Sequence, residues 1–248
     1  MTDRIERERV FQDEAVAHQT KQSVGKYYSI FQSSKEEYYR RISAGGLDGR
    51  RILELGCGAG AYAIPLVESG ALLDSVDISP RSIEMAREKS VAHGVTDRVT
   101  LHEMNAEALT FDDDSFDVVC GMGILHHLEL SPTIAGICRV LRPGGRAVFL
   151  EPMGHNPAIN LFRRLTPKLR TRDEHPLTRG DLREMAAEFE QTDWRFFYLA
   201  SLAAVPLRGT PIFEPVRRLL HRVDDRLLTL PWLREWAWVI VLTLQRTP

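Results

Sequence analysis

The chain has 248 residues, of which 44% are hydrophobic and 27% are charged, and its formal net charge is -2. This composition is that of a globular protein with a sizeable core, and it excludes a disordered, collagen-like or disulfide-stapled chain. Because no overall positive charge attracts phosphates, the sequence also argues against nucleic acid as a partner.

The cysteines and the apolar stretches indicate the cellular compartment of the protein. The charged residues 1–16 lack the apolar core of a secretory signal, and proline and charged residues interrupt the apolar stretch over 227–244. The cysteines form no CxxC pair, which is typical of a reduced protein. They are Cys57, Cys120 and Cys138. We therefore expect a cytoplasmic protein that has no membrane partner.

The first part of the chain predicts a helical cap followed by a sheet. Residues 1–50 show an aromatic-rich helical pattern that ends at the Gly45-Gly46 break. From residue 51, short apolar runs alternate with helix-period segments, which is typical of βαβ units and a parallel sheet. The predicted strands in this region are 51–55, 71–77, 98–104, 116–122 and 146–152.

Two Ser-Pro pairs predict helix starts inside this α/β region. Ser79 fits an N-cap with Pro80 at the first helical position, and Ser131 with Pro132 repeats the pattern. The second helix is predicted to end at the Pro-Gly-Gly turn over 143–145.

The last hundred residues are harder to interpret. Residues 153–178 have little periodicity and many basic residues, so they are predicted to form a lid-like loop, or alternatively a solvated amphipathic helix. A helix over 179–190, a strand over 194–199, a helical insert over 201–236 and a strand over 238–244 are predicted to follow. Residues 51–248 would then form one α/β domain.

A glycine-rich turn after the first predicted strand indicates a nucleotide-binding site. Gly56, Gly58 and Gly60 follow the apolar run and precede a helix, and glycines let a ligand approach the backbone closely. With Ala61 next, the spacing also fits the dinucleotide pattern GxGxxG/A. The turn alone therefore leaves NAD and adenosylmethionine open.

The acidic residues near this turn favour a ligand without phosphates. Glu54 lies two residues before Gly56, where it would repel a pyrophosphate and attract the ammonium and sulfonium of adenosylmethionine. Asp77, at the end of the second strand, is spaced to accept hydrogen bonds from ribose hydroxyls, or is a turn residue before Ser79. Asn105 and Ala106 follow the third strand, where they are placed to bind an adenine edge.

With these residues in view, the chain resembles the class I S-adenosylmethionine-dependent methyltransferases that act on small molecules. The resemblance covers about residues 52–152. It depends on five segments in the family's order and spacing: ILELGCGAG, VDIS, MNAEALTFDDDSFDVV, GILHHL and VLRPGGRAVFLEP. It implies a Rossmann-like α/β fold with a seven-stranded, mostly parallel sheet of order 3-2-1-4-5-7-6, with its last strand antiparallel.

The resemblance also implies S-adenosyl-L-methionine as the cofactor, lying across the carboxyl ends of strands 1, 2 and 4. Asn105 departs from the family pattern, which has Asp there. The predicted cofactor-binding residues are Glu54, Gly56, Cys57, Gly58, Gly60, Asp77, Ile78, Asn105, Ala106 and Gly121.

The acceptor is expected to bind beyond the fourth strand. His126 and His127 follow that strand, and one of them is the predicted general base, although both could instead pack the following turn. Other residues are predicted to contact the substrate from the N-terminal cap, the fifth strand and the lid. They are Tyr27, Tyr28, Glu151, His155 and His175.

The predicted function is methyl transfer to O, N or C of a small organic acceptor in a biosynthetic pathway. A cofactor-binding protein of the same fold without transfer, or an NAD(P)-dependent oxidoreductase, stays open as an alternative. His126, His127 and Glu129 do not provide the carboxylates that Mg²⁺ needs, so no metal is predicted. The chain is expected to be a monomer or a homodimer.

Overall fold

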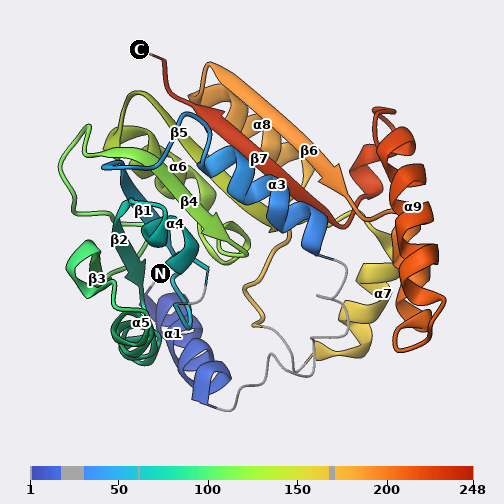
Figure 1. Cartoon of the computed structure of the whole chain (residues 1–248), viewed down its shortest axis with the longest axis horizontal. Coiled ribbons are helices and arrows are strands. Elements are labelled where there is room, and N and C mark those ends of the chain that lie inside the picture. The colour runs from blue at the N-terminus through green and yellow to red at the C-terminus, as the bar shows by residue number, and fades with distance from the viewer. Residues whose placement is uncertain (1, 18–30, 61, 168–170, 248) are drawn as a thin grey trace.

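The computed structural model describes residues 2–17, 31–60, 62–167 and 171–247, and these residues form a single twisted sheet with helices on both faces (Figure 1). The sheet has seven strands in the order β3-β2-β1-β4-β5-β7-β6. Their bounds are β1 Arg51–Leu55, β2 Leu72–Asp77, β3 Val99–Glu103, β4 Phe116–Met122, β5 Leu141–Pro152, β6 Gln191–Phe197 and β7 Val239–Gln245.

Strands β1 to β5 are parallel, whereas β7 is antiparallel to both of its neighbours, β5 and β6. This order and direction confirm the fold that the family resemblance implied. In a parallel sheet the carboxyl ends of the strands meet at one edge, and the segments that follow β1, β2 and β4 therefore come together.

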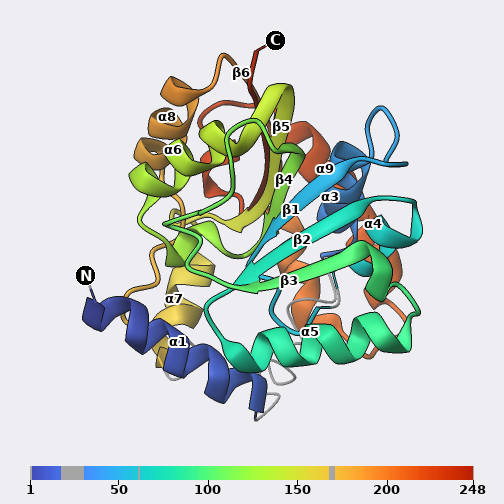
Figure 2. The ribbon, with the colours of Figure 1, turned by 90° about the vertical axis from the view of Figure 1, so that its left-hand side faces the viewer.

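Helices on the two faces of the sheet bury two separate apolar layers (Figure 2). Helices α3 (Gln32–Ile42) and α4 (Ile64–Glu68) pack on one face, and α6 (Leu130–Val140) and α8 (Arg179–Glu188) pack on the other. Neighbouring β1 residues point to opposite layers, Ile52 to the first and Leu53 to the second. The central strands are therefore buried on both faces, which explains their uninterrupted apolar runs.

One of the two predicted helix starts is confirmed and the other is wrong by two residues. Helix α5 (Pro80–Ala92) begins as predicted, and the Ser79 hydroxyl accepts a hydrogen bond from the Ser82 N–H. Helix α6 instead begins at Leu130 with Glu129 as its N-cap residue. The Glu129 N–H bonds to the Glu107 carboxylate at 2.9 Å. Pro132 is tolerated at the third helical position, because the first N–H groups of a helix have no intrahelical acceptor.

Strand β5 begins earlier than predicted, at Leu141. At the predicted turn, residues 143–145, the pairing of β5 with β4 is interrupted. Leu141 pairs with Phe116 before the interruption, and Arg146 pairs with Val118 after it. The bounds of α8, β6 and β7 differ from the predicted bounds by at most three residues.

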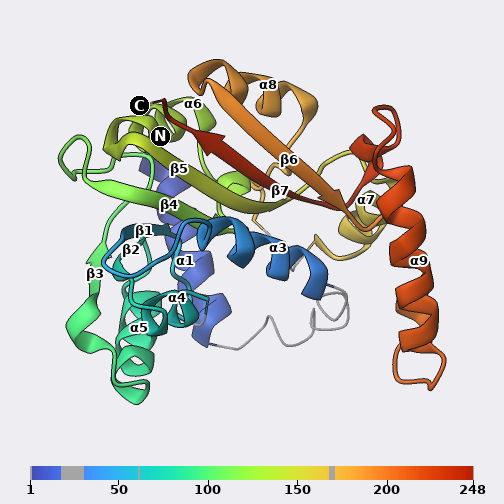
Figure 3. The same ribbon diagram turned by 45° about the horizontal axis from the view of Figure 1, so that its top comes forward.

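Helices on the flanks complete the chain (Figure 3). Helix α1 (Thr2–Ala17) packs beside α5, and η2 (Thr96–Arg98) precedes β3. Residues 153–178 contain helix α7 (Pro157–Leu165), so the predicted alternative of an amphipathic helix is correct for part of this segment, and Asn156 with Pro157 forms its start. The insert between β6 and β7 is helical, with η5 (Ala200–Leu207), α9 (Phe213–Leu227) and η6 (Arg234–Trp236). Among the described residues, no helix is both long and apolar enough to span a membrane.

Candidate active site

A cavity of about 640 Å³ lies at the carboxyl ends of β1, β2 and β4, and helix α1 forms one of its walls. Its volume lies within the range of about 300 to 1,000 Å³ that is usual for small-molecule sites. Eight of the predicted site residues line it. They are Gly56, Cys57, Gly58, Asp77, Ile78, Asn105, Ala106 and His127.

The three glycines after β1 have different surroundings. A side chain at Gly60 would lie 2.6 Å from the Ala86 Cα, and one at Gly56 would lie 2.8 Å from the Ile124 side chain. A side chain at Gly58 would meet nothing within 4 Å. All three have positive φ, which disfavours other residues. Gly56 and Gly60 thus allow close packing, while Gly58 leaves its backbone accessible to a ligand in the cavity.

The carboxylate of Asp77 fixes the glycine turn to the start of α5. Its Oδ2 accepts a hydrogen bond from the Gly58 N–H at 2.9 Å, and its Oδ1 accepts one from the Ser79 N–H at 2.9 Å. Because Asp77 also lines the cavity, it brings a negative charge to the wall where the resemblance implies a ribose.

Glu54 does not line the cavity, although the sequence predicted it there. It is only 4% exposed, and its carboxylate accepts a hydrogen bond from the Ser75 hydroxyl at 2.7 Å. Burial raises the pKa of Glu54 to about 7, opposed by the Ser75 hydrogen bond and assisted by the charge of Asp77. The carboxylate that meets the cavity at this edge is therefore that of Asp77.

Three other predicted cofactor residues have local roles in the fold. The Asn105 side-chain Oδ1 accepts a hydrogen bond from the Glu107 N–H at 3.0 Å and thereby orders the turn after β3. Gly60 and Gly121 do not line the cavity, and a side chain at Gly121 would lie 2.6 Å from Ile124 Cγ2. Gly121 thus lets the turn after β4 pack onto the sheet.

Helix α1 contributes cavity residues that the sequence did not predict, namely Arg4, Ile5, Glu8 and Gln12. Arg4 donates a hydrogen bond to the backbone oxygen of His127 at 2.9 Å and pairs with Glu107. The helical spacing of Ile5, Glu8 and Gln12 places them on one face. That spacing was readable from the sequence, but nothing local indicates that this face meets the turn after β4.

His126 is buried and held by Glu151. Its Nδ1 lies 2.8 Å from Glu151 Oε2, while Glu151 Oε1 accepts hydrogen bonds from the N–H groups of Ile124 and Leu125 at 2.8 and 2.9 Å. Burial and the neighbouring His127 lower the pKa of His126, and Glu151 opposes this shift. Neither His126 nor Glu151 lines the cavity, so both hold the histidine turn in place.

His127 lines the cavity and faces Glu8 of α1. Its Nδ1 lies 3.3 Å from Glu8 Oε2, which is an ion-pair distance, and neither of these two buried atoms makes a regular hydrogen bond with the described part of the chain. Burial acts to raise the pKa of Glu8, but hydrogen bonding to His127 and Thr171 outweighs it, so this pKa is lowered. An ionised carboxylate therefore orients His127, the histidine that lines the cavity among the described residues.

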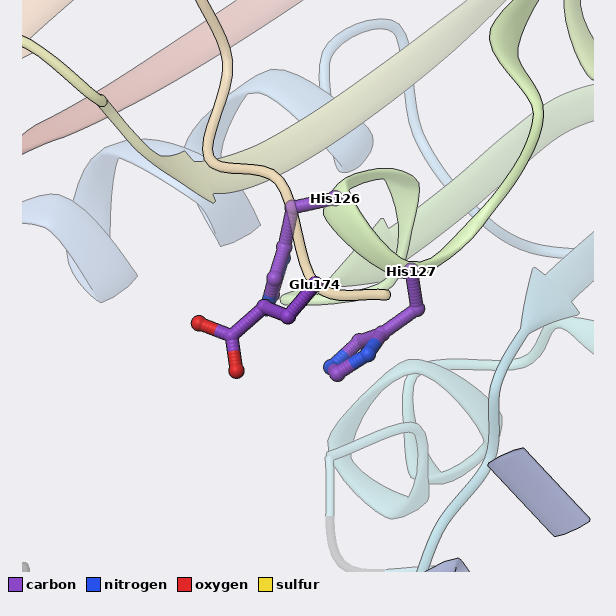
Figure 4. Close-up of side chains that lie close together, drawn as sticks. All are labelled: His126, His127 and Glu174. Atoms are coloured by element: carbon purple, nitrogen blue, oxygen red, sulfur yellow. The ribbon is translucent and has the colours of Figure 1, made fainter. Parts of the chain in front are cut away.

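His155 and His175, two other predicted substrate residues, do not line the cavity. His155 and His175 are exposed, and the N–H of His175 donates to the backbone oxygen of His126 at 2.8 Å. This bond brings Glu174 next to the two histidines, and Figure 4 shows the three side chains together. Tyr27 and Tyr28 lie outside the described residues.

Comparisons with known proteins agree with this geometry. Residues 53–149 match the family model described as "Methyltransferase domain". A ubiquinone biosynthesis O-methyltransferase of Bordetella parapertussis is 31% identical over 121 residues, which are 48% of this chain and 49% of that protein. The match thus spans about half the length of this curated relative.

Two solved structures share the fold. Phosphoethanolamine N-methyltransferase 2 of Haemonchus contortus, in complex with phosphomonomethylethanolamine and S-adenosylhomocysteine, has a TM-score of 0.65 at 19% identity and covers 96% of this chain and 60% of its own. The [4+2]-cyclase SpnF has a TM-score of 0.60 at 19% identity and covers 87% of this chain and 80% of its own.

The family match decides between the two cofactors that the glycine turn left open. The residues around the cavity suit adenosylmethionine, because the Gly58 backbone is accessible and the carboxylate of Asp77 stands beside it. Residues 53–149 are therefore a methyltransferase domain of the class I S-adenosylmethionine-dependent type, and S-adenosylmethionine is its cofactor.

Proposed function

We propose that this chain methylates a hydroxyl oxygen of a small organic acceptor, with His127 as the general base. The observation that carries the proposal is the buried pair of His127 and Glu8 in the cavity wall, with Nδ1 3.3 Å from Oε2. The carboxylate holds the proton on Nδ1, which leaves the Nε2 lone pair free to accept a proton from the acceptor.

The chemistry of the acceptor explains why a hydroxyl is favoured. Bound S-adenosylmethionine supplies an electrophilic methyl group, and the protein aligns the acceptor with it and excludes water. A free amine reacts without losing a proton first, but a hydroxyl becomes a good nucleophile only when a base removes its proton. Glu8 then stabilises the imidazolium that forms on His127.

The cavity wall supports an acceptor with an apolar body. Ile5, Met104, Met122, Ile124 and Leu128 line the same cavity as His127. The relative named for ubiquinone biosynthesis is an O-methyltransferase by its name, which agrees with an oxygen acceptor. We place the reaction in a biosynthetic pathway, and the free cysteines suit the reducing cytoplasm.

A second candidate is a protein that binds the cofactor but transfers no methyl group. The similarity to the structure of a [4+2]-cyclase supports this candidate, because it shows that one fold can host different reactions. Binding of S-adenosylmethionine without transfer of labelled methyl to any hydroxylated acceptor would favour this candidate.

The test of the proposal is a kinetic comparison of variants with labelled S-adenosylmethionine and a panel of phenolic and aliphatic alcohols. His127→Gln should lower kcat by about 10² to 10⁴-fold, the usual contribution of a general base. Its cofactor Kd should stay within about twofold of the wild type, because His127 is not assigned to adenosine.

Glu8→Gln keeps the side chain's shape and removes its charge, so it should lower kcat less than His127→Gln does. Full activity in His127→Gln would show that the base has been assigned incorrectly.

A further inference from the structure

Three possible metal ligands lie together beside the cavity, and they are not the set that the sequence suggested. One side-chain ligand atom from each of His126, His127 and Glu174 lies within 4.8 Å of the other two. The histidines belong to the short turn η3 (Leu125–His127), and Glu174 comes from the segment before α8 (Figure 4). Glu129 is instead largely exposed and lies 3.6 Å from Arg4.

Carboxylates fix which nitrogen of each histidine is free. Glu151 accepts two backbone N–H bonds on one oxygen, and its other oxygen lies 2.8 Å from His126 Nδ1, so that nitrogen carries the proton. Glu8 Oε2 lies 3.3 Å from His127 Nδ1, and this ion-pair contact favours the proton on that nitrogen as well. Both Nε2 atoms therefore present lone pairs, and neither has a hydrogen-bond partner among the residues that the structure describes.

The backbone holds the third ligand in place. The His175 N–H bonds to the His126 backbone oxygen at 2.8 Å, and Leu177 pairs with Met153 in an isolated bridge. The side chain of Glu174 is 12% exposed, and among the described residues it is paired with Arg163, whose guanidinium lies 3.9 Å from Oε1. That distance is at the limit of an ion pair, so Glu174 remains able to bind a metal ion.

We propose that Nε2 of His126, Nε2 of His127 and a carboxylate oxygen of Glu174 bind one divalent transition-metal ion such as Zn²⁺. Two imidazoles and one carboxylate form a donor set that suits zinc, cobalt, nickel or iron(II), whereas magnesium and calcium prefer oxygen ligands alone. The His126 and His127 ring centroids are 4.2 Å apart, and a tetrahedral ion about 2.0 Å from both Nε2 atoms would hold the two centroids roughly 5 Å apart, so ion binding needs only a small separation of the rings. Three protein ligands leave one coordination position open.

The arrangement behind the ligands is also that of a metal site. Histidine ligands commonly donate their second ring N–H to a carboxylate, which fixes the ring and strengthens the ligand. Glu151 and Glu8 occupy these positions for His126 and His127. Both acids are buried, at 0% and 3% exposure, and neither makes an ion pair with Lys or Arg among the described residues.

The ion and the proposed general base exclude each other, and this step rests on the proposed function. The ion takes the Nε2 lone pair of His127 that would otherwise accept the proton of the acceptor. Zinc is therefore expected to inhibit methyl transfer at the concentrations that fill the site, and EDTA is expected to restore it.

The test measures metal binding directly, without acceptor or cofactor, on the tag-free full chain after EDTA treatment and dialysis. Titration with Zn²⁺ should show one equivalent bound, and Co²⁺ should give the visible absorption bands of a nitrogen- and oxygen-ligated ion. His126→Gln and Glu174→Gln should each weaken Zn²⁺ binding at least tenfold, and Glu8→Gln should weaken it about 10 to 100-fold. Circular dichroism confirms that each variant is folded.

His93→Gln is the matched control, because His93 is an exposed histidine that lies 3.2 Å from Glu68 and has no part in the cluster. It should bind Zn²⁺ as the wild type does. The inference is overturned if the wild type binds less than half an equivalent, or if folded Glu174→Gln and His126→Gln bind as tightly as His93→Gln.

The outcomes also separate this inference from the proposed function. Loss of activity in His127→Gln without zinc binding by the wild type overturns the metal site alone. Zinc binding by the wild type together with full activity of His127→Gln in EDTA overturns the general base alone.

Discussion

The two ends of the cavity are built in different ways. At the cofactor end, Gly58, Asp77 and Ser79 follow two adjacent strands and are joined by short hydrogen bonds. At the acceptor end, Arg4 reaches His127 across 123 residues of sequence, and Thr171 bonds to Glu8 across 163. The first end depends on local backbone conformation, whereas the second depends on contacts that exist only once the chain has folded.

The largest expected effect tests the local character of the cofactor end. Gly60→Ala should lower the free energy of unfolding by about 3 kcal/mol, because it adds a side chain at φ +70° and 2.6 Å from the Ala86 Cα. Gly58→Ala, at φ +49° with nothing within 4 Å, should cost about 1 kcal/mol. Urea denaturation of both variants measures the difference.

The order of the two variants should be reversed in cofactor binding, so that the variant with the smaller loss of stability, Gly58→Ala, has the larger loss of affinity. Gly58→Ala adds a methyl group at the cavity wall, where the cofactor is expected to approach the backbone. Calorimetric titration should therefore show weaker S-adenosylmethionine binding to a folded protein. Equal unfolding free energies for the two variants would show that the glycine turn shifts to accommodate a side chain at Gly60, so that the close contact with Ala86 does not restrict this position.

The next effect concerns the buried acid behind the turn. The pKa of Glu54 is about 7 in the folded protein against an ordinary value of 4.5, because burial disfavours its charge. The folded state thus binds an extra proton between these pH values, so this stabilisation is full below pH 4.5 and is lost as the pH rises through 7. Glu54→Gln stays neutral, and it should be more stable than the wild type at pH 8 by on the order of 1 to 3 kcal/mol.

At pH 4.5 the Glu54→Gln variant and the wild type should have nearly the same unfolding free energy. Glu88→Gln, which changes an exposed acid on α5, is the control and should show no such change with pH. A Glu54→Gln variant that is less stable than the wild type at pH 8 would contradict the assignment of a protonated, buried carboxyl.

The smallest expected effect is on stability and concerns Ser79, at the contact between helices α1 and α5. Ser79 caps α5 and also contacts Asp13 of α1. Ser79→Ala should lower stability by about 1 kcal/mol, the usual value of an N-cap. Asp13→Ala keeps the cap and removes only the contact to α1, so thermal unfolding should show a smaller loss. An equal loss in both variants would place the energy in the contact between α1 and α5.

The fold and the cofactor end could be predicted because their signals are local. Alternating apolar runs identify the strands, and the glycines, Asp77 and the Ser79-Pro80 pair mark positions where the backbone conformation restricts the residue type. The start of α6 was wrong for a physical reason: Glu129 is tied to Glu107, and a proline is tolerated anywhere in the first helical turn.

The acceptor end could not be predicted to the same extent. Which histidine meets the cavity depends on Glu151 and Glu8, which hold the two rings from β5 and from α1. The cofactor end has a similar limit, shown by Glu54, Gly60 and Gly121. A correct motif does not say whether a residue contacts the ligand or supports its neighbours. Glu174 joins the histidines only through a backbone bond of the next residue.

The two hydrogen bonds of Asp77 have an entropic consequence. They close the chain from Gly58 to Ser79 into a ring, so the glycine turn and the first residues of α5 are already ordered before any ligand arrives. A preordered loop loses little conformational freedom on binding, and more of the contact energy is retained as affinity. The same carboxylate thus shapes the binding surface and reduces the cost of occupying it.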